Sequence, residues 1–552
     1  MRKPVVAVVV CFVLTGSLLG GLLGRRAQAT ADEYSRFLRR YTDVLRIVER
    51  EYVKDVEPKR LVHASIRGML RTLDPHSNFL ARREYTQLQE RQKGSYYGLG
   101  ITVQMIEGNL TVVSPFEGTP AYRLGIRSGD IISKIEGEET RGIEVDDAVK
   151  RLRGAKGSKV TISITRIGYD RPLDFTIVRD EIKLRSVPYA FKLSSGTGYL
   201  RIQDFTETTE SELEEGIQQL KEQGIESLIL DLRNNPGGLL DQAVSVSNKF
   251  LNKGSKIVST RGRTQGSDQD FFASRQATHA DLPIVVLVNS GSASASEIVA
   301  GAIQDHDRGL IVGETTFGKG LVQSIYRISE GNGLALTTAK YFTPSGRSIQ
   351  RDYSGSIDDY YFAAQRSDDM PEPRGELKHT DAGREVYGGG GIAPDIAATY
   401  PRSPKALLSL SSRSAFIEYA AFYASKNGRT RDTAGAGVVP EEIRTARSDD
   451  VRLIDRSFQV DDTVFEHFFE FLASEEIPFT KKELLENRAQ LAIKIKAEIF
   501  WSIWGAEARQ RVFISEDPQV REAVKAIPDA ADLMKDPQAY LTRLAARDKE
   551  GP

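Results

Sequence analysis

Length, composition and charge limit what this chain can be. At 552 residues it exceeds the length at which a single hydrophobic core stops growing, so several domains are expected. The 75 Lys and Arg residues are balanced by 76 Asp and Glu, and a net charge of -1 provides no basic field that would attract nucleic acid. Cys11 is the only cysteine, which excludes disulfides, cysteine nucleophiles and Cys-ligated zinc from the rest of the chain.

The N-terminus has the pattern of an export signal. An uncharged apolar run at residues 4–24 follows Arg2-Lys3 and precedes Arg25-Arg26 and Ala27-Gln28-Ala29, the order typical of a signal peptide with a small-residue cleavage site. The run is also just long enough to span a bilayer, so cleavage and retention as an inner-membrane anchor both stay open. We therefore expect residues 1–29 to direct the chain to the periplasm or extracytoplasmic face of the cell envelope.

Two different patterns follow before residue 183. Residues 32–92 have apolar side chains three or four positions apart, which predicts an amphipathic helical segment whose simplest role is packing. Residues 93–182 instead contain short β-type runs separated by glycines, such as Val160-Thr161-Ile162-Ser163-Ile164, with one helix among them. This second pattern is typical of a compact, mainly β domain.

The remaining chain divides into an α/β region and a helical region. In residues 183–401 apolar strands such as Ile284-Val285-Val286-Leu287-Val288 alternate with helices, which predicts a sheet covered on both faces. Such sheets place their sites at strand-to-helix turns. Residues 402–552 have only helical patterns, including one helix predicted from a Thr480-Glu483 capping box to Gly505. We read this region as a small helical domain and assign it no chemistry.

One strand-to-helix turn is rich in serine. Residues 289–297 read Asn-Ser-Gly-Ser-Ala-Ser-Ala-Ser-Glu and lead into an apolar helix. A serine at a helix N-terminus lies where backbone N–H groups face developing negative charge, as acyl transfer requires. However, Ser294 and Glu297 also form a capping box, and taken alone this segment favours a plain N-cap.

Two glycine-containing loops change this balance. Residues 231–238 end in Pro236-Gly237-Gly238, and paired glycines let backbone N–H groups approach a ligand closely, although a plain β-α turn is the simpler reading. Lys319 lies between two glycines; burial would lower the pKa of a lysine and make it a usable base, whereas most such lysines are solvated. The side chain of Gln323 could hold the amine of Lys319 by hydrogen bonding.

Histidine and metal alternatives have less support. None of the six histidines lies in a comparable turn, and His306 is kept as the only fallback for a base. No ligand pattern indicates a metal site or a cofactor.

Six motifs occur in order along residues 43–395. They are Leu73-Asp74-Pro75-His76, Leu232 to Gly238, Gly291 to Glu297, Thr316 to Gln323, Phe342-Thr343-Pro344-Ser345-Gly346 and Gly391-Ile392-Ala393-Pro394-Asp395. Together they resemble the carboxy-terminal processing proteases, also called tail-specific proteases. The resemblance implies a crotonase-like α/β protease core with an inserted PDZ domain, an N-terminal helical segment and an additional C-terminal helical domain.

The resemblance also implies roles for individual residues. The family's nucleophile precedes its lysine by 25 positions, which selects Ser294 as nucleophile for Lys319 as general base. Gln323 then supports the lysine, and the backbone N–H groups of Gly238 and Ala295 form the oxyanion hole.

The 93–182 region resembles a PDZ domain that would bind a free, apolar substrate C-terminus. Its carboxylate-binding loop would be Gly98-Leu99-Gly100-Ile101. Whether this domain tethers the substrate or gates the active site stays open.

The function implied is a serine endopeptidase that cleaves envelope or secreted proteins near their C-termini. The main alternative is a catalytically silent PDZ scaffold that binds such tails, and a hydratase-like enzyme is a third option that export disfavours. Residues 402–552 lie outside the matched motifs. The sequence does not choose among three roles for residues 402–552: self-association, recruitment of an adaptor, or support of the core.

Overall fold

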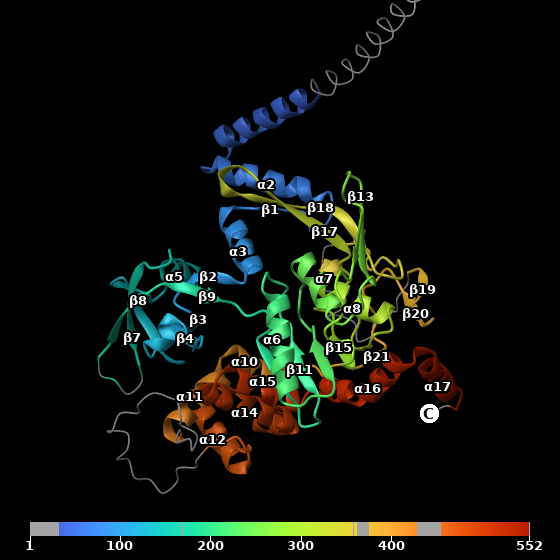
Figure 1. Ribbon diagram of the computed structural model, residues 1–552. Helices are drawn as coiled ribbons and strands as arrows, with labels where there is room; N and C mark the ends of the chain where they lie inside the picture. The colour runs from blue at the N-terminus through green and yellow to red at the C-terminus, as the bar shows by residue number, and fades with distance from the viewer. Residues whose placement is uncertain are drawn as a thin grey trace, which may run out of the picture. The chain divides into compact units, whose positions relative to one another are not determined.

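The computed structural model describes residues 33–166, 169, 171–356, 358–361, 375–427 and 454–550 (Figure 1). The expected signal peptide or anchor at residues 1–29 lies outside this described part. Among the described helices, none is long and apolar enough to cross a membrane. The described residues divide into two compact units: one contains those up to Tyr85 together with Gln323–Thr337, and the other contains those of Thr86–Val322 and from Thr338 onward.

The first unit combines helices with short antiparallel strands. Residues 33–51 are helical. The unit's other elements are α2 (Pro58–Arg71), β1 (Asn78–Leu80), the start of α3 (Arg82–Lys93), most of β17 (Leu321–Arg327) and the first half of β18 (Gly333–Phe342). β1 pairs antiparallel with β18, with Asn78 opposite Ala335 and Leu80 opposite Gly333. Gly333 is required there because a Cβ would lie 2.5 Å from the Tyr85 ring.

Residues 95–183, in the second unit, form the predicted mainly β region. Its elements are β2 (Ser95–Gly98), β3 (Ile101–Ile106), β4 (Asn109–Pro115), α4 (Pro120–Arg123), β5 (Ile131–Ile135), β6 (Glu138–Glu139), α5 (Val145–Leu152), β7 (Lys159–Thr165), β8 (Leu173–Val178) and β9 (Asp180–Lys183). The strands run in the order β3-β4-β5-β7-β8, with β6 beside β5, and β2 pairs separately with β9. Alternate residues of β7, Val160, Ile162 and Ile164, are fully buried because successive side chains of a strand point to opposite faces.

The α/β region has a six-stranded sheet in the order β10-β11-β12-β15-β16-β21. Its strands are β10 (Tyr189–Lys192), β11 (Gly198–Arg201), β12 (Leu228–Asp231), β15 (Ile284–Val288), β16 (Leu310–Gly313) and β21 (Ile396–Ala397). All neighbours are parallel except β10 and β11. Every residue of β12, β15 and β16 is buried, as expected for parallel strands covered on both faces.

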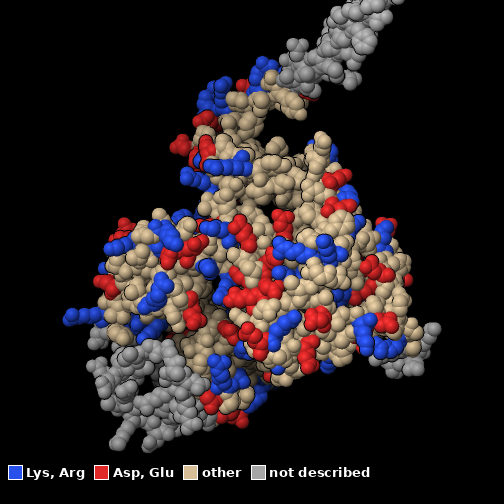
Figure 2. Space-filling model, in the orientation of Figure 1, with Lys and Arg blue, Asp and Glu red and all other residues tan. Residues whose placement is uncertain are grey.

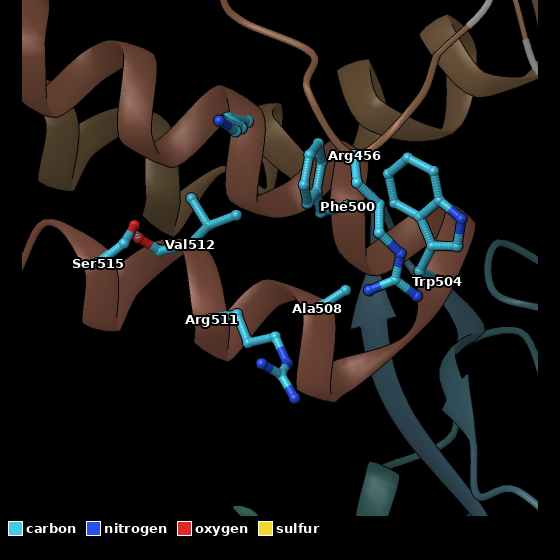
Figure 3. Close-up of a pocket in the computed structure, with 8 residues that line it drawn as sticks. Arg456, Phe500, Trp504, Ala508, Arg511, Val512 and Ser515 are labelled. Atoms are coloured by element: carbon cyan, nitrogen blue, oxygen red, sulfur yellow. Dashed lines mark hydrogen bonds between the residues drawn. The ribbon is translucent and has the colours of Figure 1, made fainter. Parts of the chain in front are cut away.

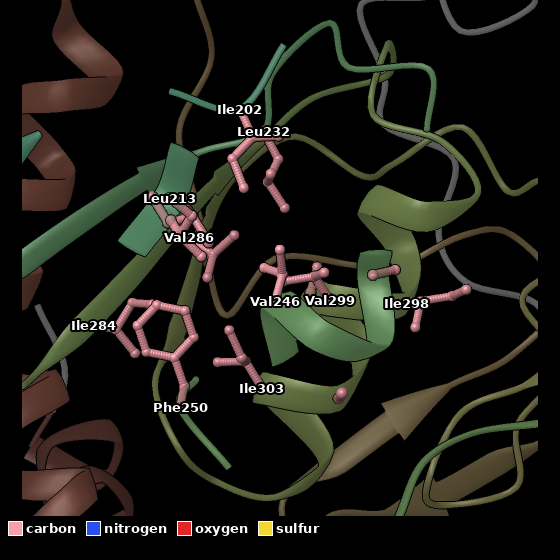
Figure 4. Packing of buried hydrophobic residues seen from close by; sticks show 14 of the residues in the cluster. Ile202, Leu213, Leu232, Val246, Phe250, Ile284, Val286, Ile298, Val299 and Ile303 are labelled. Carbon is pink, nitrogen blue, oxygen red and sulfur yellow. The ribbon is translucent and has the colours of Figure 1, made fainter. Parts of the chain in front are cut away.

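Helices cover both faces of this sheet. On one face lie α6 (Thr209–Glu222), α7 (Leu240–Asn248) and α8 (Ala295–Asp305), and Figure 4 shows Leu213, Val246 and Val299 packed with Val286 and Ile284 of the sheet. On the other face lies α16 (Pro518–Lys535). Its side chains Val520, Ala523 and Ala530 pack against the residues of β15 and β16 that point to this face. Part of the C-terminal helical region therefore belongs to the core of the α/β sheet.

A smaller antiparallel sheet and the remaining helices complete the second unit. The second half of β18 pairs with β13 (Lys256–Gly262), which pairs with β14 (Gln269–Phe272), and β19 (Leu377–His379) pairs with β20 (Glu385–Tyr387). The other helices are α10 (Lys405–Ser412), α11 (Ala415–Asn427), α12 (Asp462–Ser474), α13 (Lys481–Glu486), α14 (Arg488–Trp504), α15 (Ala506–Ser515) and α17 (Pro537–Glu550). Figure 2 shows basic and acidic residues interspersed on the visible face.

The helix predicted from Thr480 to Gly505 is wrong in one respect, because it is two helices. The first ends at Glu486 and the second begins at Arg488, with a non-helical Asn487 (φ -113°, ψ 31°) between them. Thr480 occupies the N-cap position, but its side chain makes no cap hydrogen bond. The apolar spacing continues across this break, so hydrophobic periodicity alone could not reveal it.

Candidate active site

Three loops leave the same edge of the parallel sheet. β12 ends at Asp231, β15 at Val288 and β16 at Gly313, and register places Asp231 beside Leu287 and Val288 beside Gly313. The carboxyl ends of parallel strands form the edge where α/β folds place their sites. Each strand end leads into one of the predicted segments. We call them the glycine loop (residues 231–238), the serine loop (residues 289–297) and the lysine loop (residues 313–320). The fold therefore brings the three segments together.

Ser294 is the N-cap of α8 and has an unusual backbone conformation. Its φ of 56° and ψ of -112° lie in a region that costs a non-glycine residue about 1–3 kcal/mol. It is 7% exposed, and it forms the expected capping box with Glu297. Its side chain also contacts the Tyr341 hydroxyl, and burial raises the pKa of Tyr341 to about 12.

The neighbouring serines have structural partners. The Ser292 hydroxyl donates to the Leu232 carbonyl at 2.7 Å, and the Ser296 hydroxyl donates to the Asn235 carbonyl at 2.9 Å. Both side chains are fully buried. These bonds attach the serine loop to the glycine loop. Ser292 and Ser296 therefore have structural roles, whereas Ser294 is distinguished by its strained backbone.

The glycine loop contacts the serine loop so closely that side chains are excluded. Gly237 has a φ of 97°, and a Cβ there would lie 2.7 Å from the Ala293 carbonyl oxygen and 2.8 Å from the Ser294 Cβ. Gly238 has a φ of 152° and packs against a different segment, because a Cβ there would lie 2.1 Å from the Phe205 carbonyl oxygen. Among the described residues, no hydrogen bond acceptor is found for the N–H groups of Gly238 or Ala295. Backbone N–H groups without an acceptor are what an oxyanion hole requires.

Lys319 is half-buried rather than fully solvated. The glycines on either side are packed: a Cβ on Gly318 would lie 3.1 Å from the Gly391 nitrogen, and one on Gly320 would lie 2.8 Å from the Gln350 nitrogen. The lysine loop is also tied to the serine loop, because the Phe317 N–H donates to the Ser292 carbonyl at 2.9 Å. The backbone at Lys319 is thus held on both sides.

Glu297 joins the serine and lysine loops through one carboxylate. One oxygen accepts from the backbone N–H groups of Ser294 (2.7 Å) and Lys319 (2.9 Å). The other accepts from the Thr316 hydroxyl (2.6 Å) and the Gly318 N–H (2.7 Å). The side chain is fully buried; burial raises the pKa of Glu297, while its four donors oppose that rise because they stabilise the carboxylate. The sequence pattern indicates only the capping-box role of Glu297, because its partners in the lysine loop follow it by about 20 positions.

Gln323 lies in the first compact unit, whereas Ser294 and Lys319 lie in the second. It is half-buried on β17, and its side-chain Nε2 donates to the Thr337 hydroxyl oxygen at 3.3 Å. Thr337 in turn donates to Asp74 of the Leu73-Asp74-Pro75-His76 turn at 3.0 Å. No sequence pattern links this turn to Gln323.

The predicted carboxylate-binding loop connects β2 to β3. Gly100 has a φ of 81°, and a Cβ there would lie 2.3 Å from Thr119. Leu99 is 2% exposed and belongs to the hydrophobic core of this region, while Ile101 is half-buried. Of the two apolar side chains of this loop, Leu99 therefore packs mainly inward.

The other groups weighed from sequence do not form a competing site. Both ring nitrogens of His306 are engaged: Nδ1 lies 2.7 Å from an Asp381 oxygen and Nε2 lies 2.6 Å from the Lys256 carbonyl oxygen. Within the described ranges no cluster of three or more His, Cys, Asp or Glu side chains could hold a metal ion.

A pocket of about 240 Å³ lies among the C-terminal helices (Figure 3). Its lining includes the cationic side chains Arg456, Lys496 and Arg511 around Phe500 and Trp504. None of the predicted site residues lines it. It therefore contributes nothing to the arrangement of the three loops.

Comparison with known proteins identifies the family. Residues 196–361 match the model of peptidase family S41, and residues 111–166 match that of the PDZ domain. The chain is 44% identical over 349 residues to a carboxy-terminal-processing protease from Bartonella bacilliformis, covering 62% of this chain and 80% of that protein. This chain belongs to the carboxy-terminal processing proteases. The resemblance and the α/β fold with a PDZ domain are thereby confirmed, and the chain is a serine peptidase.

Other family members match a similar share of the chain. The carboxy-terminal processing protease CtpA of Bacillus subtilis is 35% identical over 349 residues, covering 63% of this chain and 73% of that protein. A solved photosystem II D1 C-terminal processing protease is 26% identical, with a TM-score of 0.34, over 65% of this chain and 92% of that structure.

Proposed function

We propose that this member of the family is an active endopeptidase that cleaves protein substrates near their C-termini, with Ser294 as nucleophile and Lys319 as general base. The observation that carries the proposal is the Glu297 carboxylate, which accepts hydrogen bonds from the backbones of both residues. A buried acceptor shared by two loops fixes the nucleophile and the base relative to each other, as catalysis by positioning requires. A serine with only a capping role has no need of a bond to the lysine loop.

In the reaction, a neutral Lys319 takes the proton from the Ser294 hydroxyl as its oxygen attacks the scissile carbonyl carbon. The N–H groups of Gly238 and Ala295 stabilise the resulting oxyanion. As the C–N bond breaks, the protonated lysine gives its proton to the leaving amine and an acyl-enzyme forms. Water, deprotonated by Lys319, then releases the acyl product and regenerates the serine. Gln323 supports the lysine amine during these transfers.

The substrates are proteins with free, apolar C-termini, and the PDZ domain binds such an end through the loop at residues 98–101. Gly100 supports this assignment, because its positive φ and its close approach to Thr119 are conditions that only glycine meets. Export through residues 1–29 would place the enzyme at the cell envelope, where such substrates occur.

The test compares cleavage of an unstructured protein with an apolar C-terminus by the purified chain and by three variants. Ser294→Ala and Lys319→Ala should each abolish cleavage while the circular dichroism spectrum stays unchanged. Ser290→Ala is the matched control, because Ser290 lies in the same loop before the turn into α8, and it should retain activity. Cleavage by Lys319→Ala would contradict the dyad. If the wild-type chain binds such tails without cutting them, the alternative of a silent PDZ scaffold is correct.

A further inference from the structure

The turn at residues 73–76 contains a buried carboxylate that the reaction above does not use. Asp74 is 8% exposed. Its Oδ1 accepts from the N–H groups of His76 and Ser77, both at 2.8 Å, and its Oδ2 accepts from the Ser77 hydroxyl at 2.7 Å. Burial acts to raise the pKa of Asp74, but these hydrogen bonds outweigh it, so the pKa is lowered and the group is a carboxylate near neutral pH.

A second set of bonds joins this carboxylate to Gln323 through Thr337. The Thr337 hydroxyl donates to Asp74 Oδ1 at 3.0 Å, and the Thr337 N–H donates to the Ser77 hydroxyl oxygen at 3.1 Å. Gln323 Nε2 then donates to the Thr337 hydroxyl oxygen at 3.3 Å. All of these residues lie in the first compact unit, where pairing of β1 with β18 fixes the strand that carries Thr337.

The direction of these bonds is set by chemistry. A carboxylate can only accept, so the single proton of the Thr337 hydroxyl must point toward Asp74. The Thr337 oxygen is then left as an acceptor, and of the two ends of the Gln323 amide only the NH₂ group can donate to it. The carbonyl oxygen Oε1 of Gln323 is consequently the end turned away from Thr337.

We propose that Asp74, acting through Thr337, is a positioning residue that fixes which end of the Gln323 amide is presented for catalysis. The inference rests on the proposed function, in which Gln323 supports the amine of Lys319, four positions earlier in the chain. A neutral amine must keep its lone pair for the serine proton, so a supporting group has to accept from its N–H bonds. An amide oxygen does this and an amide NH₂ does not.

The test measures kcat and KM for Thr337→Val, Thr337→Ser, Gln323→Ala and the Thr337→Val/Gln323→Ala double variant. Valine matches the shape of threonine but removes the hydroxyl, so kcat should fall about five- to tenfold, the value of one neutral hydrogen bond, with KM little changed. Serine keeps the hydroxyl and should restore kcat. In the Gln323→Ala background the valine substitution should lower kcat no further. Thr72→Val, which removes a hydroxyl that donates to the nearby Met69 carbonyl, is the matched control and should leave kcat unchanged.

Two results would overturn the inference: an unchanged kcat in Thr337→Val, or the same fold loss with and without Gln323, which is what a purely structural role predicts. Asp74→Ala should lower kcat at least as much as Thr337→Val, and again only when Gln323 is present. Failure of the proposed function looks different, because the wild-type chain would not cleave or Ser294→Ala would. In that case the thermal midpoint is measured for Thr337→Val with and without Gln323→Ala. A shift that disappears when Gln323 is replaced supports the hydrogen-bond chain, and an equal shift in both backgrounds overturns it.

Discussion

Replacing Glu297 by glutamine tests whether one carboxylate holds the active-site loops together. Glutamine has the same shape, but it offers one acceptor oxygen where the carboxylate offers two, and all four partners of Glu297 are donors. The less costly orientation turns the new NH₂ group toward Thr316, whose hydroxyl can rotate to accept. The Gly318 N–H is then buried without an acceptor, which costs about 1–3 kcal/mol of unfolding free energy.

The activity of Glu297→Gln should fall because Gly318 immediately precedes the proposed base. Displacement of a catalytic group by about 1 Å can cost 10²-fold, so kcat/KM should decrease between about ten- and a hundredfold. Activity is measured per folded molecule, with urea unfolding of the same sample. Glu498→Gln is the matched control: Glu498 is 7% exposed, and the Oε1 that accepts from Arg509 can be kept by a glutamine. If Glu297→Gln loses stability but keeps wild-type kcat/KM, the carboxylate has no positioning role.

Three further predictions concern the glycine loop, the PDZ domain and acid stability. Gly237→Ala should lower kcat/KM at least about tenfold, because its Cβ would clash with the Ala293 carbonyl and the Ser294 side chain; retained activity in a peptide-cleavage assay would count against close contact of the loops. Amidating the substrate's C-terminus should raise KM several-fold with kcat little changed, and an unchanged KM would argue against carboxylate capture. The pKa of Glu214 is lowered to about 2: burial opposes the shift, and hydrogen bonds from Gln218 and Lys249 outweigh it. The ionised Glu214 carboxylate therefore stabilises the fold above pH 4.5, and this stabilisation is lost as the pH falls toward 2. Lys249→Met should lower the thermal midpoint at pH 7 but not at pH 2.

The elements that sequence predicts best are those whose burial is uniform. The apolar run from Ile284 to Val288 coincides with β15, because a strand covered on both faces needs apolar side chains at every position. The serine turn is also predictable, since small residues and a capping box precede an apolar helix. Its distinctive feature is the strained backbone of Ser294, and the residue type alone gives no sign of it.

The hydrogen bonds that complete the site are out of reach of sequence patterns. Glu297 and Lys319 are 22 positions apart and meet through a backbone N–H, which every residue except proline has. Asp74 and Thr337 are 263 positions apart, and no periodicity links residues at that distance. Family motifs locate both segments in the sequence, but only the structure shows which of their atoms form hydrogen bonds.

The C-terminal region illustrates how composition can hide a structural role. Residues 402–552 read as a separate helical domain, yet α16 covers the face of the sheet formed by Val285 and Leu287. The buried guanidinium of Arg233, in the glycine loop, pairs with Asp231 at the end of β12 and with Asp517 at the N-cap of α16. Removing this helix would expose an apolar sheet face and leave Arg233 without one of its two carboxylates, so the glycine loop that carries the proposed oxyanion hole depends on α16. A chain ending near residue 401 would therefore lack part of the protease core.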